Sequence, residues 1–312
     1  MSETEVLRIF EANRPHLMGL AYRMSGTVTD AEDVVQDAWL RWQGTDHAAV
    51  ACPKAYLLRV TMRLCLDRAR SAQARREVYV GPWLPEPIVD LAQIGAAEAG
   101  QQNQAERADE LSVALLLVLE RLSPLERAAF LLHDVFDFSF DEIGATLHRA
   151  PSACRKLASR ARQRIRQERP ARAVPPDLAR QFAARFHRAL QSGDLTTFAE
   201  MLAEDAVLIA DGGGKVYAAL RPICGRDHIV RFLFGIASKF GWPKEIRRLP
   251  LNTGEGFLVT EADGGVHTWS LDWSSDGRVK AIYLLRNPDK LRRLCRTMMD
   301  RQVPTAATRD LS

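Results

Sequence analysis

The fold is decided by residues 123–166, which read SPLERAAFLLHDVFDFSFDEIGATLHRAPSACRKLASRARQRIR. Serine and glutamate stand three apart in Ser123–Glu126 and again in Ser139–Glu142, and this spacing is typical of the capping box that begins a helix. Pro124 occupies the first helical position, where its missing amide hydrogen costs no hydrogen bond. The stretch therefore predicts two short helices followed, after a short break, by a third helix that begins at Pro151.

The predicted third helix has two chemically different faces. Small and apolar residues recur at helical spacing on one face: Cys154, Leu157, Ala158, Ala161 and Ile165. The opposite face is polar and basic, with Ser152, Arg155, Lys156, Ser159 and Arg160. A buried face opposite an arginine-rich face, directly after a tight turn, is typical of a helix-turn-helix that reads DNA. The sequence thus predicts DNA as a partner.

Basic residues are concentrated in two blocks, although the net charge of the 312-residue chain is only +4. Residues 59–76 contain six arginines and one acid, and residues 149–169 contain seven arginines and one lysine against one glutamate. Two such blocks predict two contact points on a polyanion, with salt-dependent binding. Either block alone is equally consistent with a solvated helix face.

The remaining composition is that of an ordinary globular protein, with 46% apolar and 26% charged residues. The five cysteines have no metal-ligand spacing, so the sequence predicts no metal site, no cofactor and a reduced compartment. It contains no signal-peptide pattern and no apolar run of membrane-spanning length. We therefore expect a cytoplasmic protein with no membrane partner.

Residues before position 80 follow a helical pattern that Gly26 interrupts. Thr29-Asp30-Ala31-Glu32 fits another capping box, and the helix that it predicts has one charged face. That face consists of Asp30, Asp33, Asp37 and Arg41. It is either a partner-binding surface or a solvated face.

A proline-rich segment, Trp83-Leu84-Pro85-Glu86-Pro87, ends helix formation. A stretch rich in glycine, alanine and glutamine follows and predicts a linker. Apolar side chains in a linker need cover, so Trp83 and Leu84 are expected either to dock on a neighbouring surface or to pack against the preceding helix.

The pattern changes after Pro176, where an amphipathic helix is followed by strand-like runs. Asp263-Gly264 and Asp276-Gly277 fit hairpin turns between such runs. A strand is also expected at Val216–Leu220, and a last basic helix follows Asn287-Pro288. Helices followed by an antiparallel sheet indicate an α+β domain.

These motifs resemble those of extracytoplasmic-function sigma factors of the sigma-70 family. The match is carried by Thr29–Trp42, Tyr56–Arg76 and Leu122–Arg166. Residues 177–290 resemble a SnoaL-like cone of the nuclear-transport-factor-2 type. The resemblance implies a multi-domain chain: sigma region 2 at 1–79, a linker at 80–105, the region 4 helix-turn-helix at 106–169, a SnoaL-like domain at 177–296 and a disordered tail at 304–312.

The resemblance also implies partners and residue roles. The charged face of Asp30, Asp33, Asp37 and Arg41 would dock on the core of bacterial RNA polymerase. The −10 element of promoter DNA would be contacted by the first basic block, through Arg63, Arg68, Arg70, Arg75 and Arg76. The −35 element would be contacted by Ser152, Arg155, Lys156, Ser159 and Arg160. An anti-sigma protein or a small ligand of the C-terminal domain is a further candidate partner.

One position departs from the family pattern. Small sigma factors commonly have an asparagine where this chain has Leu64. The family's base preference at the −10 element therefore does not carry over.

Three short motifs resemble signatures of sigma factors that have this appended domain. The first is the segment Trp83, Leu84, Pro85, Glu86 and Pro87; the second is Asp211, Gly212, Gly213, Gly214 and Lys215; the third is Asn287, Pro288, Asp289 and Lys290. The resemblance implies that the C-terminal domain regulates the chain. We expect the glycine loop to dock on the linker, with Lys215 or backbone amides near Glu86 and with Trp83 in an apolar recess.

Two other functions fit parts of the sequence. One is a DNA-binding regulator that works without polymerase, against which the acidic helix argues mildly. The other is a SnoaL-like enzyme fused to a helix-turn-helix, with an acid-base pair drawn from His187, His228, His267, Asp211, Asp263 and Asp272. No two of these have a spacing that ensures proximity, so we expect no enzymatic activity.

Overall fold

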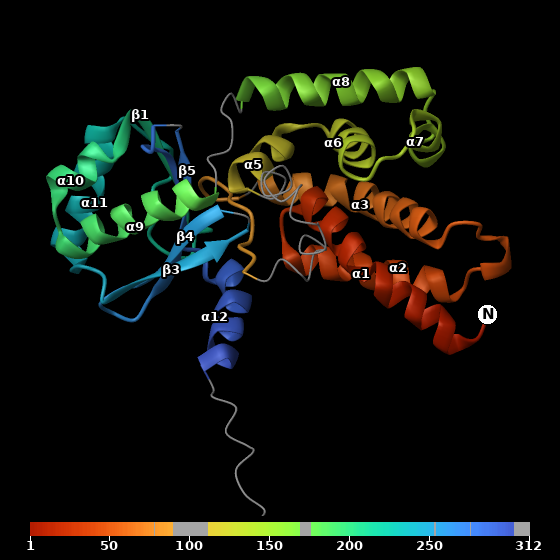
Figure 1. Ribbon diagram of the computed structural model, residues 1–312, viewed down its shortest axis with the longest axis horizontal. Helices are drawn as coiled ribbons and strands as arrows, with labels where there is room; N and C mark the ends of the chain where they lie inside the picture. Colours follow the sequence, from red (N-terminus) through yellow and green to blue (C-terminus); the bar gives the residue numbers. More distant parts are fainter. Residues whose placement is uncertain (78, 90–111, 169–175, 253, 275, 303–312) are drawn as a thin grey trace, which may run out of the picture.

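The computed structural model describes residues 1–77, 79–89, 112–168, 176–252, 254–274 and 276–302. Helices from the first part of the chain form one side of the molecule, and a sheet covered by helices forms the other (Figure 1). The segment at 79–89 and helix α12 (Pro288–Gln302) lie between the two sides.

The first part of the chain is helical throughout its regular elements. These are α1 (Glu3–Ser25), α2 (Val28–Gln43), η1 (His47–Ala49), α3 (Pro53–Glu77), α5 (Val113–Arg121), α6 (Pro124–Phe130), η4 (Leu131–Val135), α7 (Phe140–Leu147) and α8 (Pro151–Glu168). The short element η4 is a π-helical turn that continues α6.

Both capping boxes of the deciding stretch are present as predicted. Ser123 caps α6 and Ser139 caps α7, and in each case the glutamate three residues later bonds back to the serine. His148 then ends α7 in the left-handed conformation, with φ of 53°, and α8 follows after two residues. Local sequence chemistry therefore builds the helix-turn-helix.

The capping box predicted at Thr29 is wrong by two residues. Helix α2 begins at Val28, and its N-cap is Thr27, whose hydroxyl accepts from the Asp30 amide at 3.2 Å. Gly26 ends α1 as predicted, with φ of 74°, a conformation that favours glycine. The caps of the two helices, Gly26 and Thr27, are thus consecutive residues, and the Val28 amide is left for a more distant acceptor.

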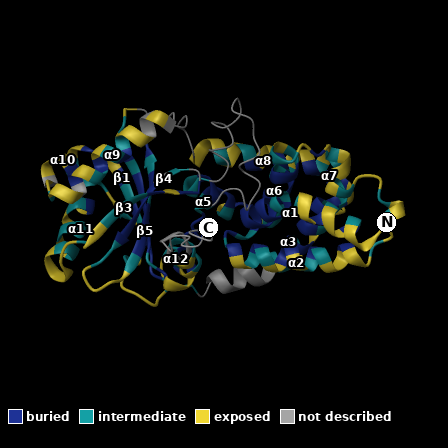
Figure 2. Cartoon of the chain, turned by 60° about the horizontal axis from the view of Figure 1, so that its bottom comes forward, coloured by how far each residue is buried: buried dark blue, intermediate teal, exposed yellow. Residues whose placement is uncertain are grey.

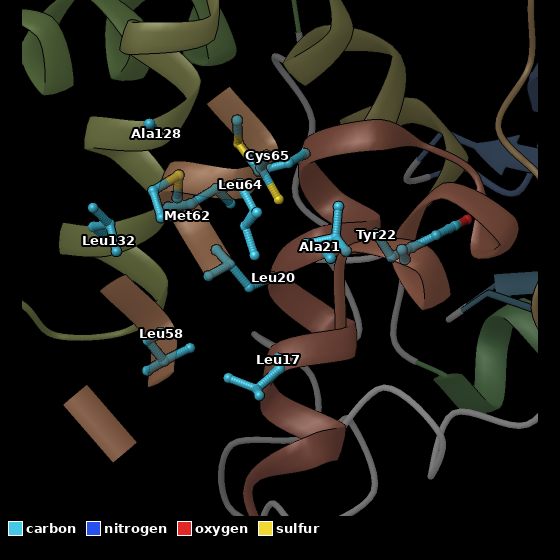
Figure 3. Packing of buried hydrophobic residues seen from close by; sticks show 14 of the residues in the cluster. Leu17, Leu20, Ala21, Tyr22, Leu58, Met62, Leu64, Cys65, Ala128 and Leu132 are labelled. Carbon is cyan, nitrogen blue, oxygen red and sulfur yellow. The ribbon is translucent and has the colours of Figure 1, made fainter. Parts of the chain in front are cut away.

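The helices before and after the linker share one hydrophobic core. Leu17 and Leu20 of α1, together with Met62 of α3, are fully buried or nearly so, and Ala128 and Leu132 of the second group of helices lie in the same cluster (Figure 3). Figure 3 shows these side chains converging from α1, α3, α6 and η4. The two predicted DNA-reading modules therefore pack directly against each other.

The second part of the chain is α+β, as predicted. It contains α9 (Pro176–Ser192), α10 (Leu195–Glu200), β1 (Leu202–Asp211), β2 (Ile223–Cys224), α11 (Arg226–Phe240), β3 (Glu245–Leu251), β4 (Gly254–Thr260), β5 (Val266–Trp273), β6 (Val279–Leu285) and α12. The predicted hairpin turns at Asp263-Gly264 and Asp276-Gly277 join β4 to β5 and β5 to β6.

The sheet is mixed, and this detail differs from the antiparallel prediction. Its strand order is β2-β1-β6-β5-β4-β3, and β1 pairs with β6 in parallel. Parallel pairing of two strands so distant in sequence is not readable from local patterns. The strand predicted at Val216–Leu220 is also wrong: these residues are irregular, and the short strand β2 follows them.

Helices α9, α10 and α11 cover one face of the curved sheet and enclose a core around Phe186, Phe257 and Trp269. Burial colouring shows a continuous dark interior on each side of the molecule (Figure 2). Among the residues that the structure describes, no helix is long and apolar enough to cross a membrane. Our predictions for the later part of the linker, for its boundary at residue 105 and for the tail at 304–312 lie outside the described residues.

Candidate functional site

The predicted −35 face of α8 is exposed to solvent. Ser152, Arg155, Lys156, Ser159 and Arg160 are all exposed, whereas Cys154, Ala158 and Ala161 on the opposite face are fully buried. The guanidinium of Arg155 lies 5.1 Å from the ring centre of Phe140, which orients it at the start of the helix. Polar groups near a helix start can reach base edges in the major groove.

The predicted −10 arginines of α3 are already engaged inside the chain. Arg63 donates to the carbonyl oxygens of Thr146 and Ala145 at 3.3 and 3.1 Å, and both of these residues belong to α7. Arg68 donates to Asp37 at 2.5 Å and lies 3.6 Å from Asp33. The side chains of Arg70, Arg75 and Arg76 lie outside the described residues.

The charged face of α2 is partly used in the same way. Asp37 and Asp33 pair with Arg68, and Asp30 accepts from the Thr27 hydroxyl at 2.7 Å. Arg41 is exposed near the end of the helix. Half-exposed ion pairs of this kind stabilise little, so a partner could replace them at small cost.

A buried arginine joins the two helical groups. Arg127 of α6 donates to the carbonyl oxygen of Met24 in α1 at 2.6 Å and lies 3.4 Å from Glu120. Burial lowers the pKa of Arg127 to about 10. No sequence signal pointed to this residue, because the contact joins positions more than 100 apart.

The segment at 79–89 docks along the turn between α1 and α2. The Glu86 amide donates to Gly26 O at 2.9 Å, and its carbonyl accepts from the Tyr22 hydroxyl at 2.7 Å. Its carboxylate accepts from the Val28 amide at 2.8 Å, so the linker supplies a cap for α2. Burial raises the pKa of Glu86, and the backbone bonds from Val28 and Thr29 partly oppose this.

Asp211, at the end of β1, is the centre of the contact between the linker and the C-terminal domain. It is fully buried, and its carboxylate accepts from the Tyr79 hydroxyl at 2.6 Å, the Leu84 amide at 2.9 Å and Lys290 Nζ at 2.8 Å. It also accepts from the Gly213 amide at 3.0 Å. Burial, together with Asp211, raises the pKa of the Tyr79 phenol.

Lys290 completes this junction from α12. Its ammonium donates to Leu84 O at 2.6 Å and lies 4.3 Å from the ring centre of Trp83 and 4.9 Å from that of Tyr79. The Asn287 amide nitrogen donates to the Tyr79 hydroxyl at 2.7 Å. Three motifs that are distant in the sequence therefore meet around one buried ion pair.

Two details of the expected docking are wrong. Lys215 pairs with Asp289 at the surface and not with Glu86, because Glu86 faces the helical side of the molecule. Leu84, and not Trp83, fills the apolar recess: Leu84 is 2% exposed, whereas Trp83 is only partly buried and packs where a side chain at Gly26 would lie.

The glycine loop is shaped by its contacts. Gly213 has φ of 60°, and a Cβ there would overlap the Asn287 amide group. Gly214 has φ of 69°, and a Cβ there would lie 3.0 Å from Val80 of the linker. Both the backbone conformation and the close approach therefore require glycine.

An apolar cluster extends the junction to a third element. Leu84 packs with Leu249, Leu258 and Tyr283 on the face of the sheet opposite α9–α11, and the partly buried Leu117 of α5 packs against the same cluster. The linker, the first helix after it and the C-terminal domain thus form one interface.

Further contacts tie the C-terminal domain directly to α1 and α2. Arg293 of α12 lies 2.5 Å from Glu32 of α2. Asn252, in the turn between β3 and β4, donates to the Tyr22 hydroxyl at 2.8 Å and exchanges backbone and side-chain bonds with Ile88. These residues were missed in the sequence because only the assembled fold gives them partners.

The candidate catalytic residues do not form one site. His187 contacts Ile246 O, His228 contacts Cys224 O, and Asp263 accepts from the Gly265 amide within a turn. Asp272 accepts from its neighbouring amide, and Asp211 lies in the junction. His267 is buried and lies 3.2 Å from Glu261. Among the described residues there is no metal-binding cluster of His, Cys, Asp and Glu.

Comparisons with known proteins agree with this architecture. The family described as Sigma-70 region 2 matches residues 9–75, and the family described as Sigma-70, region 4 matches residues 112–165. The ECF RNA polymerase sigma factor SigJ of Mycobacterium tuberculosis is 39% identical, over 90% of this chain and 91% of that protein. This chain is an extracytoplasmic-function sigma factor. Its two sigma regions are followed by the α+β domain that begins at α9.

Other relatives place the similarity in the same family. The sigma factor resembles the probable ECF RNA polymerase sigma factor SigI of M. tuberculosis, with 38% identity over 62% of this chain and 65% of that protein. It also superimposes on the crystal structure of SigJ with a TM-score of 0.74 and 35% identity, over 92% of this chain and 98% of that one. Sigma factors bind the core of RNA polymerase and promoter DNA, and that is the function of this chain.

Proposed function

We propose that the structure is the resting form of the sigma factor, that it must open between its two DNA-reading modules, and that the C-terminal domain controls this opening. In this proposal the functional units are residues 1–79, 106–169 and 177–296. The chain acts in the cytoplasm with core polymerase and is not itself an enzyme.

The observation that carries the proposal is the engagement of Arg63 with α7. A residue assigned to the −10 element donates both of its hydrogen bonds to the helix-turn-helix assigned to the −35 element. The shared core around Leu20 and Ala128 joins the same two groups of helices. In this arrangement, the two reading surfaces are neighbours.

Promoter geometry is incompatible with such close packing. Elements centred at −10 and −35 are about 25 base pairs apart, which is about 85 Å along B-form DNA. Helix α8 has 18 residues and is about 27 Å long. One of the two DNA-reading modules must therefore move by tens of ångströms before both promoter elements can be read. This separation of the modules also exposes Arg63.

The proposed residue roles follow from this opening. Asp33 and Asp37 are engaged by Arg68 at rest, and we assign them, with Asp30 and Arg41, to the polymerase-binding face. Binding of polymerase to that face frees Arg68 for DNA, together with the other arginines of the first basic block. Ser152, Arg155, Lys156, Ser159 and Arg160 are exposed in the resting form and read the −35 element.

The junction around Asp211 supplies the control. It holds the linker between the modules through the Leu84 amide, the Leu84 carbonyl and Tyr79. For the two modules to move apart, the linker segment at 79–89 must detach from the C-terminal domain. An anti-sigma protein would be an additional partner, because the fused domain already acts on the same linker.

A reversible crosslink between the modules tests the proposal. Cysteines at Arg59→Cys in α3 and Ala145→Cys in α7 would be joined by a bis-maleimide reagent whose spacer contains a disulfide, after replacement of the more accessible native cysteines Cys52, Cys224 and Cys295 by serine. We expect the joined chain to lose promoter-specific transcription with core polymerase, and reduction to restore it.

The single-cysteine chains treated with the same reagent are the matched controls, and they should retain transcription. Undiminished transcription by the joined chain would show that the modules need not separate. Failure of the untreated chain to support transcription would instead contradict its assignment as a promoter-directing factor.

A further inference from the structure

The ring of Phe140 has two close neighbours at the start of the DNA-reading helix. Its centre lies 4.2 Å from that of the His133 ring, with the two planes inclined by 32°. The guanidinium of Arg155 lies over the same Phe140 ring, 5.1 Å from its centre. The three side chains come from η4, from the first residue of α7 and from the early part of α8, so the cluster joins all three elements of the helix-turn-helix region.

The π-helical turn η4 places His133 in this cluster. The Phe136 amide donates to Leu131 O at 3.1 Å, five residues back, which widens the helix, and Asp137 then turns the chain with φ of 58°. His133 Nδ1 lies 2.9 Å from Phe138 O, and because a carbonyl oxygen only accepts, this nitrogen carries the hydrogen. The imidazole is therefore held in one orientation against Phe140. Turns of this kind are rare and are often found at functional sites.

Phe140 itself is held on both its backbone and its ring. It is the first residue of α7, directly after the N-cap Ser139, and its partly buried ring packs against the core that the helices share. An aromatic ring on a capped helix end has little freedom to move. Phe140 therefore presents a fixed surface to Arg155.

Arg155 is held without using its hydrogen-bond donors. It is exposed, and it makes no hydrogen bond or ion pair with any residue that the structure describes. Two other arginines of α8 differ in this respect: Arg162 donates to Asp134 at 2.7 Å, and Arg164 donates to Arg121 O at 3.1 Å. Stacking on a ring thus leaves all the N–H groups of Arg155 available to a partner.

Such an arrangement suits the recognition of guanine. Arginine reads guanine through two parallel N–H bonds to acceptors on the base edge, and this requires one orientation of the guanidinium plane. A long side chain loses conformational freedom when it adopts a single orientation. A ring that holds the guanidinium before DNA arrives removes part of that cost.

We infer that Phe140 is a positioning residue that determines base specificity at the −35 element, because its ring holds Arg155 ready to read a guanine. This inference rests on the assignment of Arg155 to the −35 element in the proposed function. Phe140 acts through Arg155 and does not itself contact the base. Without the ring, Arg155 still attracts phosphates, which carry no sequence information, but it selects a base less well.

A role for Phe140 in packing alone predicts a different outcome, and the chain offers a matched control. Phe136 is also partly buried against the shared core, four residues earlier. Among the described residues, no cation lies over its ring. Phe136→Leu therefore removes the same packing as Phe140→Leu without removing a contact with Arg155.

A selection experiment with the full chain and core polymerase measures base specificity directly. Promoter DNA randomised at the −10 and −35 regions is bound, complexes that resist heparin are recovered, and the DNA is sequenced. The readout is the ratio of guanine to adenine at each −35 position. This ratio does not depend on the fraction of chain that is folded, so a partial loss of stability leaves it unchanged.

We expect the wild-type chain to prefer guanine at one −35 position by about five- to a hundredfold, and Arg155→Ala to remove that preference. Phe140→Leu should reduce it about two- to fivefold, the effect of one exposed contact between a cation and a ring. Phe140→Tyr keeps the ring and should retain the preference, and Phe136→Leu should retain it as well. In the Arg155→Ala chain, Phe140→Leu should cause no further change, because the two residues act as a pair.

Three results would overturn the inference. An unchanged guanine preference in Phe140→Leu, with loss in Arg155→Ala, would show that Arg155 reads the base without help and would leave the proposed function standing. Equal reductions in Phe140→Leu and Phe136→Leu would show that packing is responsible. A guanine preference that survives Arg155→Ala would contradict both the positioning role of Phe140 and the proposed role of Arg155.

Discussion

Replacing Asp211 by asparagine should open the junction without unfolding the domains. The carboxylate accepts four hydrogen bonds and opposes the charge of Lys290, whose side chain is 9% exposed. Asparagine has one acceptor oxygen and no charge, so it leaves the ammonium buried and uncompensated. Breaking a buried ion pair by removing one partner costs about 3–5 kcal/mol.

The lower end of that range is appropriate, because Lys290 keeps its bond to Leu84 O and its contact with the Trp83 ring. A loss of about 3 kcal/mol raises the open population of the junction about a hundredfold. Native-state hydrogen exchange measures this change directly. The amides of Glu86 and Ile88 are suitable reporters, because their acceptors, Gly26 O and Asn252 Oδ1, are not altered by the substitution.

We expect exchange at Glu86 and Ile88 to accelerate about a hundredfold, and exchange in strands β4 and β5 to stay slow. Asp205→Asn is the matched control, because Asp205 is exposed on the same strand, β1. Acceleration of less than tenfold would show that the ion pair does not hold the linker. Equal acceleration in β5 would show that the whole C-terminal domain, and not the junction, had been destabilised.

Three further predictions concern the glycine loop at Gly213, the buried His267 and the DNA-reading helix α8. Gly213→Ala places a side chain at a positive φ and against Asn287, whereas Gly264→Ala places one at a positive φ in open space. In a denaturant titration, Gly213→Ala should lower the free energy of unfolding by about 1 kcal/mol more than Gly264→Ala does. A similar loss in both variants would show that the close contact between Gly213 and Asn287 does not matter. Burial, as the largest cause, lowers the pKa of His267, so below pH 6.5 the unfolded chain binds a proton that the folded chain does not, and the free energy of unfolding falls as the pH decreases from 6.5. His267→Gln should reduce the slope of this pH dependence by up to about 1.4 kcal/mol per pH unit. An identical pH profile of melting temperature in the variant and the wild type would contradict a neutral His267 ring. Arg155→Ala should reduce promoter-specific initiation about tenfold or more, while a pull-down with core polymerase stays unchanged; parallel loss of both would place Arg155 outside the DNA surface.

Local chemistry made the helix-turn-helix predictable. The boxes at Ser123 and Ser139 need only residues three apart, and the burial of Ala158 follows from helical spacing on α8. The same reasoning failed at Thr29, where two threonines two residues apart both fit a cap. The structure uses Thr27 as the N-cap, and in this arrangement the Val28 amide donates to the carboxylate of Glu86, which is distant in the sequence.

The junction was only half predictable. The motifs that form it were recognised, but the charge on the loop tip suggested Lys215 as the partner of the linker. The structure instead buries Lys290 of α12 against Asp211, while Lys215 pairs with Asp289 at the surface. The parallel pairing of β1 with β6 and the bonds from Arg63 to α7 also depend on assembly, which local patterns do not encode.

Energy transfer between dyes on α3 and α7 tests the central claim most directly. The dyes would be attached at Arg59→Cys and Ala145→Cys in the chain whose native Cys52, Cys224 and Cys295 are serine. The free chain should show high transfer, as expected for helices in contact, and the complex with core polymerase and promoter DNA should show a separation larger by tens of ångströms. High transfer in an actively initiating complex would contradict the claim that the closed chain must open.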